Sequence, residues 1–432
     1  MASPKSVALY TLGCKLNFSE SSAIGRSFQN AGYGLADFDN GADIYVINTC
    51  SVTDFADRKC RKIIRRARRV NPDALVVVTG CYAQLKPDEI AGFDGVDMVL
   101  GAAEKFRIVE YVNALDMGGH TVVKAGNIKQ FLPFETSWSQ GDRTRAFLKV
   151  QDGCDYKCSF CTIPQARGES RSDSIPNVAA HAEQLGRDGI REIVLTGVNI
   201  GDFREPETGL GFIDLIRELD RISTVDRFRI SSIEPNLCSD EIIAFVAGSD
   251  RFMPHFHMPL QSGNNKQLKL MRRRYGRELY ADRVSEIKRL MPHACIGVDV
   301  IVGFPGETEE DFEQSYRFIN ELDVSYLHVF TYSERANTPA AEMEGAIDMG
   351  VRKERNQRLR MLSEKKKNYF YRQFEGQTRE VLLEHNREVG FLTGFTDNYI
   401  KLNLQASDDM VNTIVEAKIG NLTEDGIAKA TI

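Results

Sequence analysis

Three cysteines fall within eight residues, in the segment Cys154-Asp-Tyr-Lys-Cys158-Ser-Phe-Cys161. Three thiolates at this spacing can surround one metal cluster, but an iron–sulfur cubane has four corners, so one iron would lack a protein ligand. An open iron can bind a substrate or a cofactor. The alternative is a structural zinc knuckle, but zinc loops usually join one C-x-x-C to a second pair, and no fourth cysteine or histidine lies nearby in the sequence. The spacing therefore favours a cluster with an open iron.

A second set of three cysteines lies in the first part of the chain. Cys14, Cys50 and Cys81 each follow an apolar run typical of a buried strand, and polar stretches with helical periodicity separate them. Their separations of 36 and 31 residues correspond to one βα unit each. The thiols should therefore lie just past the carboxyl ends of parallel strands, where open α/β sheets bind ligands. A single buried cysteine usually packs as a small apolar side chain, but repetition at three equivalent positions predicts a second three-thiolate cluster site.

The apolar pattern predicts an α/β protein with three parts. Residues 1–126 should form a parallel α/β sheet, residues 140–372 a partial (β/α)6 barrel, and residues 373–432 a small β-barrel of short alternating strands. The CxxxCxxC loop follows the first predicted barrel strand, at the carboxyl edge where barrels of this kind carry their chemistry. The barrel strands are expected at Phe147–Val150, Glu192–Thr196, Arg227–Ser231, Phe256–Pro259, Gly297–Val302 and Tyr326–Thr331.

Glycines and polar residues follow several of these predicted barrel strands. Each segment alone could be an ordinary βα turn, but their recurrence around one rim predicts contacts with a bound cofactor, because glycine lets backbone amides approach a ligand closely. The residues concerned are Gly197, Ser231, Glu234, Gln261 and Gly303.

Basic residues are concentrated in two stretches, although the chain as a whole has a formal net charge of −6. A solvent-exposed helix usually mixes the signs of its charges, so a run of one sign indicates contact with phosphate. The second stretch, residues 350–375, reads as a long basic amphipathic helix that closes the barrel. The first predicts an RNA-binding helix through Arg58, Lys59, Arg61, Lys62, Arg65, Arg66, Arg68 and Arg69.

Composition places the protein among soluble globular chains of the cytoplasm. The hydrophobic fraction is 42% and the charged fraction 27%. The sequence has no secretory signal pattern and no apolar run of about 18 residues, so we expect no membrane partner. The nine cysteines are then interpreted as reduced thiols available for metals, and not as a disulfide framework. Cys60, Cys238 and Cys295 belong to no such group of cysteines and are expected to be ordinary core or surface residues.

The motifs together resemble one known family. A CxxxCxxC loop at the start of a partial α/β barrel is similar to the radical S-adenosylmethionine superfamily, and the preceding three-cysteine sheet and terminal β-barrel resemble its methylthiotransferases. Thr11-Leu-Gly-Cys-Lys-Leu-Asn17 and the following Ser-Glu-Ser look closest to the branch that modifies N6-threonylcarbamoyladenosine at position 37 of tRNA. Leu195–Asn199 and His257–Gly263 look like the family's barrel signatures, and the tail looks like an RNA-binding TRAM domain.

This resemblance implies two [4Fe–4S] clusters and S-adenosylmethionine as cofactors. Cys154, Cys158 and Cys161 would hold the cluster that binds S-adenosylmethionine and yields a 5′-deoxyadenosyl radical, which abstracts hydrogen from C2 of the adenine. Cys14, Cys50 and Cys81 would hold an auxiliary cluster that carries or supplies sulfur. An aromatic C2–H is neither acidic nor electrophilic enough for side-chain acid–base chemistry, so a cofactor must bring the reactive species. The implied cofactor or substrate contacts are Phe160, Gly197, Ser231, Glu234, Gln261 and Gly303.

The implied partners are the anticodon stem-loop of tRNA and a one-electron reductant such as flavodoxin or ferredoxin. Two sister activities share the same cluster ligands: methylthiolation of isopentenyladenosine in tRNA and of an aspartate in a ribosomal protein. Gln165, where an aromatic residue is common, and the dense run Arg272-Arg-Arg274 depart from the expected pattern and bear on the choice of substrate. An alternative of another class is an iron–sulfur RNA-binding protein that senses redox state without catalysis.

Overall fold

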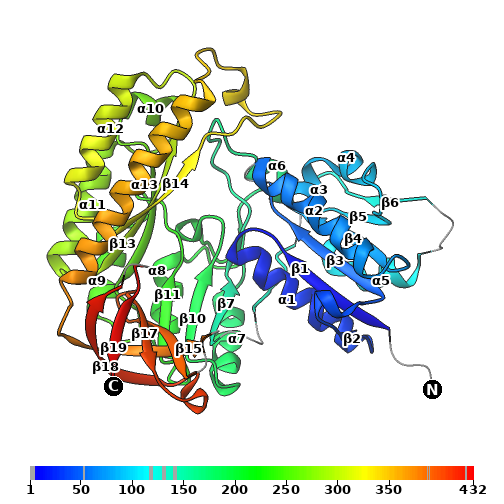
Figure 1. Cartoon of the computed structure of the whole chain (residues 1–432), viewed down its shortest axis with the longest axis horizontal. Coiled ribbons are helices and arrows are strands. Elements are labelled where there is room, and N and C mark those ends of the chain that lie inside the picture. The colour runs from blue at the N-terminus through cyan, green and yellow to red at the C-terminus, as the bar shows by residue number, and fades with distance from the viewer. Residues whose placement is uncertain are drawn as a thin grey trace.

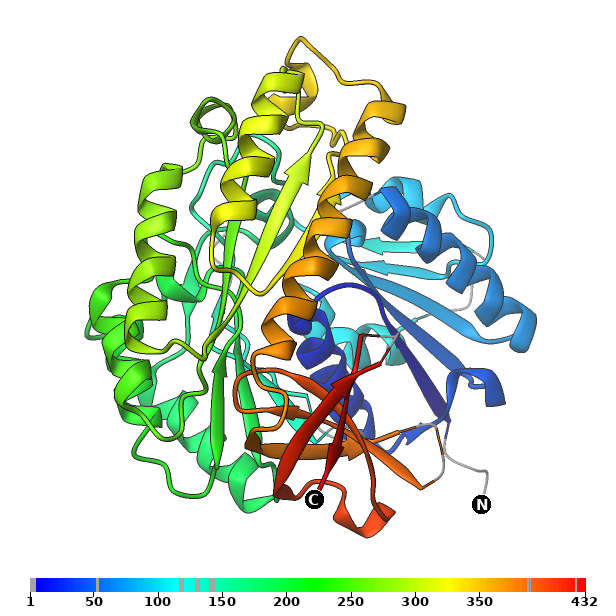
Figure 2. The ribbon, with the colours of Figure 1, turned by 60° about the vertical axis from the view of Figure 1, so that its left-hand side comes forward.

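The computed structural model describes residues 5–51, 54–115, 120–128, 133–139, 144–386, 388, 390–423 and 426–432, with the side chains of residues 54 and 55 excepted. These residues form an amino-terminal parallel sheet, a central series of parallel strands with helices outside, and a closed carboxyl-terminal barrel (Figures 1 and 2). The predicted fold class and the order of its three parts are therefore confirmed. Within the described ranges, no helix is long and apolar enough to cross a membrane.

The amino-terminal sheet has six parallel strands in the order β2-β1-β3-β4-β5-β6. Strand β2 lies on one side of β1, and strands β3 to β6 extend from its other side. The direction in which strands are added therefore reverses between β1 and β3. Ligands of open parallel sheets bind outside the carboxyl ends of the strands at such a reversal. The strands are β1 (Ser6–Thr11), β2 (Gly34–Leu35), β3 (Ile44–Thr49), β4 (Leu75–Gly80), β5 (Met98–Leu100) and β6 (Val122–Lys124).

Helices cover both faces of this sheet, so β3 and β4 are buried along their whole length. Val46 packs with residues of α1 on one face, and its neighbour Ile47 packs with residues of α2 on the other. This arrangement explains why these strands are continuous apolar runs and not alternating ones. The helices of this part are α1 (Lys15–Asn30), α2 (Asp54–Val70), α3 (Cys81–Leu85), α4 (Pro87–Ala91) and α5 (Ile108–Asn113).

All six predicted barrel strands are present in the central part, as two parallel three-stranded sheets in the orders β11-β10-β7 and β12-β13-β14. The halves meet where the amide of Ile233 donates to the carbonyl of His257 at 3.0 Å. Strands β7 and β14 end the two sheets, so the barrel is open between them. The strands are β7 (Arg145–Lys149), β10 (Glu192–Thr196), β11 (Arg227–Ile230), β12 (His255–Gln261), β13 (Cys295–Val302) and β14 (Tyr326–Thr331).

The outer layer of the central part consists of helices that pack apolar residues against the outward faces of the strands. The longest, α13 (Met349–Arg372), packs along β14 at the open edge (Figure 2). The short α6 (Ile163–Arg167) and α10 (Asn265–Leu270), with the strand pair β8 (Gln151–Asp152) and β9 (Arg171–Ser172), shape the rim. The other outer helices are α7 (Ile175–Arg187), α8 (Phe212–Leu219), α9 (Asp240–Gly248), α11 (Arg277–Leu290) and α12 (Glu309–Glu321).

The carboxyl-terminal strands close into a barrel in the order β15-β16-β17-β19-β18. It packs beneath the amino-terminal ends of the central strands, where Arg145 pairs with Glu384 at 2.8 Å and Arg227 pairs with Glu380 at 3.2 Å. The CxxxCxxC loop lies at the opposite, carboxyl-terminal end of these strands. The barrel strands are β15 (Thr378–His385), β16 (Phe391–Thr396), β17 (Lys401–Gln405), β18 (Ile414–Leu422) and β19 (Ala428–Thr431).

Candidate two-cluster site

The CxxxCxxC loop joins β8 to α6 and holds its three sulfur atoms beside hydrogen-bond donors. The amides of Tyr156 and Ile163 lie 3.4 Å from the sulfurs of Cys154 and Cys161, respectively. Arg273 donates from Nη1 to the sulfur of Cys158 at 3.1 Å. Donors aimed at sulfur are typical of iron–sulfur ligands, whose potential they tune.

Burial determines the protonation of the thiols in this loop when no metal is bound. It raises the pKa of Cys154 to about 11 and that of Cys161 to about 12, with the neighbouring cysteines adding to the rise. These thiols are therefore protonated at neutral pH, and a metal must displace their protons to bind them.

The second three-cysteine set lies where the sequence predicts it, at the carboxyl ends of three adjacent strands. Cys14 precedes α1, Cys50 follows β3, and Cys81 begins α3. Two glycines permit this convergence. A Cβ atom on Gly13 would lie 2.6 Å from the Cβ of Cys50, and one on Gly80, at a φ of +98°, would lie 2.3 Å from the carbonyl oxygen of Thr49. Cys14 remains accessible, whereas Cys50 and Cys81 are buried.

Helix α6, which directly follows the CxxxCxxC loop, packs against α3, which begins with Cys81. Its last residue, Arg167, is buried and lies within electrostatic reach of both Cys14 and Cys81. Arg167 Nη2 also donates to Oδ1 of Asn17 at 2.7 Å. One short helix therefore connects the two cysteine sets.

Arg167 belongs to a buried ionic network between the amino-terminal and central parts. Glu20 on α1 accepts from Arg167 at 2.9 Å and pairs with Lys105 at 2.7 Å and Lys149 at 3.8 Å. Asp152 pairs with Arg167 at 2.9 Å, with Arg171 at 3.0 Å and with Lys149 at 3.5 Å. Four cations thus surround two carboxylates. Burial raises the pKa of the Cys14 thiol, and the charge of Arg167 partly offsets this rise.

The pKa values of the two acids reflect this surplus of positive charge. Burial by itself raises the pKa of Glu20, but Arg167, Lys105 and Lys149 outweigh it and lower that pKa to about 2. The same balance, with Arg167 as the leading cation, holds the pKa of Asp152 below its usual range. Both carboxylates are therefore charged at any pH at which the protein works.

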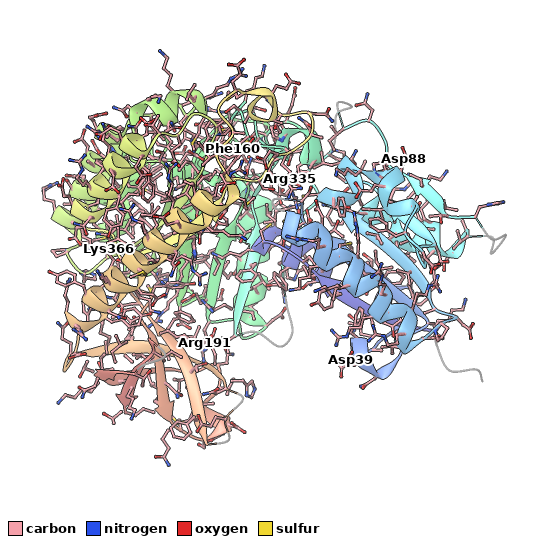
Figure 3. The ribbon with its side chains drawn as sticks, turned by 45° about the horizontal axis from the view of Figure 1, so that its top comes forward. Asp39, Asp88, Phe160, Arg191, Arg335 and Lys366 are labelled. Carbon is pink, nitrogen blue, oxygen red and sulfur yellow. The ribbon has the colours of Figure 1, made fainter. Side chains whose placement is uncertain are left out.

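A cavity of about 220 Å³ opens beside the CxxxCxxC loop, inside the barrel. Two of the residues predicted as ligand contacts, Phe160 and Gln261, line it, and Gln261 has a φ of +66°. Such a backbone conformation is unfavourable for a non-glycine residue and is often found at functional sites. In Figure 3, Phe160 and Arg335 lie on the side of the barrel that faces the amino-terminal sheet. The cavity is lined by Phe160, Cys161, Thr162, Ile163, Gln261, Asp299, Ile301, Phe330, Thr331, Tyr332, Ser333 and Arg335.

The other predicted ligand contacts have protein neighbours that account for their identities. A Cβ atom on Gly197 would lie 2.9 Å from Gln151, and one on Gly303, at a φ of +74°, would lie 2.3 Å from Arg352 on α13. Close packing therefore explains both glycines. Glu234 is paired with Arg273, the same arginine that contacts Cys158. Ser231 is buried at the end of β11, and its amide donates to the carbonyl of Leu195.

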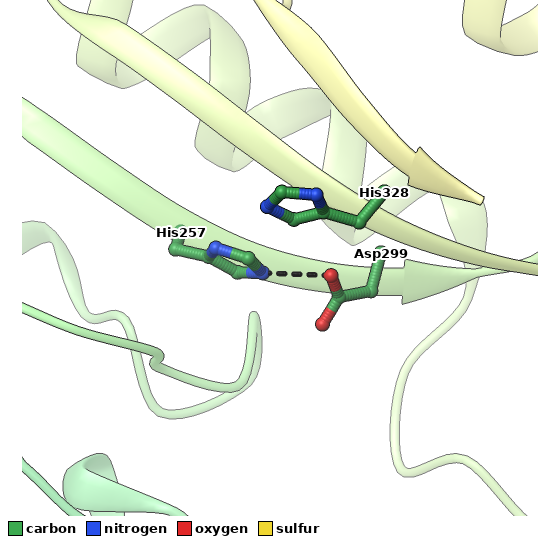
Figure 4. A group of neighbouring side chains, drawn as sticks. All are labelled: His257, Asp299 and His328. Carbon is green, nitrogen blue, oxygen red and sulfur yellow. Dashed lines mark ion pairs between the residues drawn. The ribbon is translucent and has the colours of Figure 1, made fainter. Parts of the chain in front are cut away.

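Three ionisable side chains meet on the inner face of β12, β13 and β14 (Figure 4). His257 Nε2 lies 2.9 Å from Oδ1 of Asp299, and the ring of His328 lies 5.3 Å from that of His257, centroid to centroid. One ligand atom from each of the three residues lies within 4.8 Å of the others. The sequence motifs include the segment containing His257 but do not predict this cluster, because only strand pairing brings Asp299 beside His328.

The predicted RNA-binding helix is α2, and acids neutralise part of its basic run. Arg61 pairs with Glu89, Arg66 with Asp39 and Arg68 with Asp97. The other five members have no ion pair within the described part of the chain, and all five are exposed: Arg58, Lys59, Lys62, Arg65 and Arg69.

Helix α13 uses several of its basic residues within the protein. Arg352 and Arg355 are buried and paired with Glu334 and Glu307, respectively. Arg358 pairs with Glu309 and with Glu313. The charge of this helix is therefore partly structural.

Glu20 and Arg167 were not predicted from the sequence to belong to the site. A signal for Glu20 was present, because it occupies the same helical stripe as Leu16, Ile24 and Phe28, which are buried. A charged residue on such a stripe requires a buried partner. The partner's identity depends on how α1 packs against the central part.

Both cysteine sets have the chemistry that a [4Fe–4S] cluster requires. Each offers three thiol ligands and leaves the fourth position to a cofactor or substrate. Sulfur-directed donors surround the loop cysteines, and excess positive charge adjoins Cys14 and Cys81. A negatively charged cluster with thiolate ligands is stabilised in both settings.

Comparison with known proteins gives two family matches. The model described as uncharacterized protein family UPF0004 matches residues 6–101, and that of the radical SAM superfamily matches residues 148–319. The first includes Cys14, Cys50 and Cys81, and the second includes the CxxxCxxC loop. The chain also resembles the solved structure of the radical S-adenosylmethionine methyltransferase TsrM from Kitasatospora setae, with a TM-score of 0.58 at 16% identity over 78% of this chain and 77% of that one. At this identity the likeness concerns the fold alone.

Relatives of much higher identity extend over nearly the whole chain. The threonylcarbamoyladenosine tRNA methylthiotransferase MtaB of Bacillus subtilis is 44% identical over 96% of this chain and 93% of its own. The protein of the same name from Aquifex aeolicus is 37% identical over 92% and 96%. The tRNA-2-methylthio-N(6)-dimethylallyladenosine synthase of Staphylococcus haemolyticus is 31% identical over 97% and 83%. The chain therefore belongs to the radical S-adenosylmethionine methylthiotransferase family.

Proposed function

We propose that this enzyme inserts a methylthio group at C2 of N6-threonylcarbamoyladenosine at position 37 of tRNA. The observation that supports the proposal is the contact between α6, which follows the CxxxCxxC loop, and α3, which begins with Cys81; Arg167 at the end of α6 lies within electrostatic reach of Cys14 and Cys81. Four relatives named for threonylcarbamoyladenosine are 34% to 44% identical to the chain, and those named for dimethylallyladenosine are 29% to 31% identical. The higher identity to relatives named for threonylcarbamoyladenosine favours the threonylcarbamoyl substrate.

Cys154, Cys158 and Cys161 would hold the cluster that binds S-adenosylmethionine, and Cys14, Cys50 and Cys81 the auxiliary cluster. Together these groups supply the radical and sulfur chemistry that side chains cannot provide. The chain's own contribution is geometry. Arg167 and Glu20 fix the auxiliary site against the barrel, while Phe160 and Gln261 shape the cavity beside Cys161.

The tRNA would approach the open side of the barrel. Figures 1 and 2 show α13 and the carboxyl-terminal barrel on one side of the amino-terminal part. Exposed cations on α2 would contact phosphates of the anticodon stem-loop, and the closed barrel of residues 373–432 would act as a TRAM-like RNA-binding domain. Residues 1–126 and 140–372 would form the auxiliary-cluster domain and the radical core.

The one-electron donor would dock at a second cavity, of about 1080 Å³, on the other side of the CxxxCxxC loop. Cys154 lies in its wall with Lys157, Arg272 and Arg274, and these three cations outnumber the two carboxylates of Asp155 and Glu169. Within the dense arginine run, Arg273 instead turns inward to Cys158. An acidic donor such as a flavodoxin or ferredoxin would match this surface in the cytoplasm.

Mass spectrometry of modified nucleosides from a deletion strain tests the proposed activity. We expect 2-methylthio-N6-threonylcarbamoyladenosine to disappear, its unmodified parent to accumulate, and a plasmid copy of the gene to restore the product. Loss of methylthiolated isopentenyladenosine, or of a modified ribosomal-protein aspartate, would assign a sister activity instead. The non-catalytic sensor predicts no 5′-deoxyadenosine from reduced protein that contains both clusters.

A further inference from the structure

Lys15 lies next to Cys14 on α1, the helix that packs against β7 of the central part. It directly follows Cys14 and begins α1, yet its side chain lies among residues of the central barrel, within electrostatic reach of Asp299, Glu192 and Arg145. Lys15 is partly exposed, and it has no ion pair with any residue that the structure describes. Its ammonium group is therefore available to a ligand.

The charged groups near Lys15 already have partners. Arg229 pairs with Glu192 at 2.8 Å, and Arg145 pairs with Glu384 at 2.8 Å. Asp299 lies 2.9 Å from Nε2 of His257. Lys15 is therefore the cation of this group that has no ion pair among the described residues, and its charge would attract a negatively charged ligand.

Asp299 and His328, which both interact electrostatically with Lys15, belong with His257 to the cluster of Figure 4. His328 is exposed and within electrostatic reach of Lys15. Asp299 also lines the cavity that contains Cys161. Polar groups therefore extend from the residue after Cys14 to the cavity beside Cys161, which is the path that a substrate would occupy between the two cluster sites.

A divalent metal ion is an alternative occupant of the three residues. Two imidazoles and one carboxylate are suitable metal ligands. However, the positive charge of Lys15 acts on His328 and opposes a cation bound there. The same charge favours an anionic organic ligand.

We propose that Lys15, together with His328 and the His257–Asp299 pair, binds the N6 substituent of the adenine and selects the threonylcarbamoyl group by its carboxylate. This inference rests on the proposed function. The threonyl carboxylate would accept a hydrogen bond from Lys15. The hydroxyl and ureido groups of the same substituent would form hydrogen bonds with the cluster of His257, Asp299 and His328. A dimethylallyl group carries no charge and would leave Lys15 without a partner, which is how a polar site rejects an apolar analogue.

The test uses three anticodon stem-loop RNAs that differ only at N6 of adenosine 37. One carries the threonylcarbamoyl acid, one its uncharged carboxamide and one the dimethylallyl group. We expect the wild-type enzyme to favour the acid over the carboxamide in kcat/KM on the order of 10- to 100-fold, the value of a hydrogen bond to a charged group. Lys15→Met should abolish that preference mainly by raising KM for the acid, and Lys15→Arg should retain most of it.

Lys15 adjoins a proposed cluster ligand, so iron content and RNA-independent cleavage of S-adenosylmethionine must match the wild type in both variants. A Lys15→Met enzyme with full iron that keeps the wild-type acid-to-carboxamide ratio would overturn the inference. A stoichiometric divalent metal that binds the wild type but neither His257→Ala nor His328→Ala would also overturn the inference. If wild-type enzyme methylthiolates the dimethylallyl RNA and not the acid, the proposed function fails as well, and the wild-type measurements alone reveal it.

Discussion

Arg167 and Glu20 lie 147 residues apart in the chain and are joined by two buried hydrogen bonds, from Nη1 to Oε1 at 2.9 Å and from Nη2 to Oε2 at 3.2 Å. The arginine ends the helix that follows the CxxxCxxC loop, and the glutamate lies on the helix that follows Cys14. The contact therefore fixes the distance between the two candidate cluster sites.

Arg167→Met should lower the free energy of unfolding by about 3 kcal/mol, because the buried carboxylates of Glu20 and Asp152 would each lose one cationic partner. Trp138, the single tryptophan of the chain, reports on this region, since Arg26 from α1 stacks over its ring at 4.2 Å. Urea unfolding of cluster-free protein, followed by tryptophan fluorescence, measures the change in stability.

The matched control for this experiment is Arg187→Met. Arg187 pairs with Glu183 at 2.6 Å on an exposed helical face, with side-chain exposures of 60% and 46%. Its removal should cost less than about 0.5 kcal/mol. Equal shifts in the two variants would contradict a special role for Arg167.

Acid should release the contact through Glu20. Burial opposes ionisation of this group, but its three cationic neighbours lower its pKa to about 2, from an ordinary value of 4.5. Because the folded-state pKa is depressed, the stabilisation is complete above pH 4.5 and is lost as the pH falls toward 2. The free-energy difference between wild type and Glu20→Gln, on the order of 3 kcal/mol near neutrality, should shrink across this window. A difference that is constant from pH 6 to pH 2.5 would argue against an ionised Glu20.

Each three-cysteine set should account for half of the bound iron. Anaerobic reconstitution of the wild type should give about eight irons, and alanine substitution of Cys14, Cys50 and Cys81, or of Cys154, Cys158 and Cys161, should give about four. Cys60 is the control, because it belongs to neither set and lies on α2 in the apolar core of the amino-terminal part, and Cys60→Ala should keep the full iron content. Loss of all iron from either triple variant would show that the two sites do not assemble independently.

Helix α2 should contribute to salt-sensitive binding of tRNA. Lys62→Gln with Arg65→Gln removes two exposed charges that have no ion pair among the described residues. The slope of log K against log salt should fall in magnitude by about 0.7 to 0.9 for each phosphate that the variant no longer neutralises. Arg66→Gln is the control, because Arg66 is already paired with Asp39 and packs over Phe38. Filter binding measures all three proteins, and an unchanged slope in the double variant would exclude α2 from the RNA interface.

Charge reversal at Arg272 and Arg274 should slow electron delivery by a protein donor. Both residues are exposed at the cavity that contains Cys154. We expect the rate of 5′-deoxyadenosine formation with reduced flavodoxin to fall about tenfold or more, through slower association. Dithionite is too small to need the docking surface, so the rate with dithionite should be unchanged. An equal decrease with both reductants would indicate damage to the cluster site itself.

The sequence by itself determined the fold class and the two cysteine sets. Strand periodicity is a local property, and a cysteine that follows each strand must lie at the carboxyl edge of a parallel sheet. The prediction therefore placed Cys14, Cys50 and Cys81 correctly at adjacent strand ends, and the six barrel strands appear where expected. Local pattern also found the basic run of α2.

Only the tertiary structure decided which charges act together. Arg61, Arg66 and Arg68 looked equivalent to their neighbours, but acids from other segments neutralise them. Gly197 and Gly303 were predicted as ligand contacts, and in the structure close packing neighbours also account for glycine at both positions. The surroundings of Lys15 and Arg167 depend on how α1 packs against the barrel. This packing leaves Lys15 without an ion pair among the described residues and pairs Arg167 with the buried carboxylate of Glu20. Long-range pairing of this kind depends on how domains dock, which no local pattern encodes.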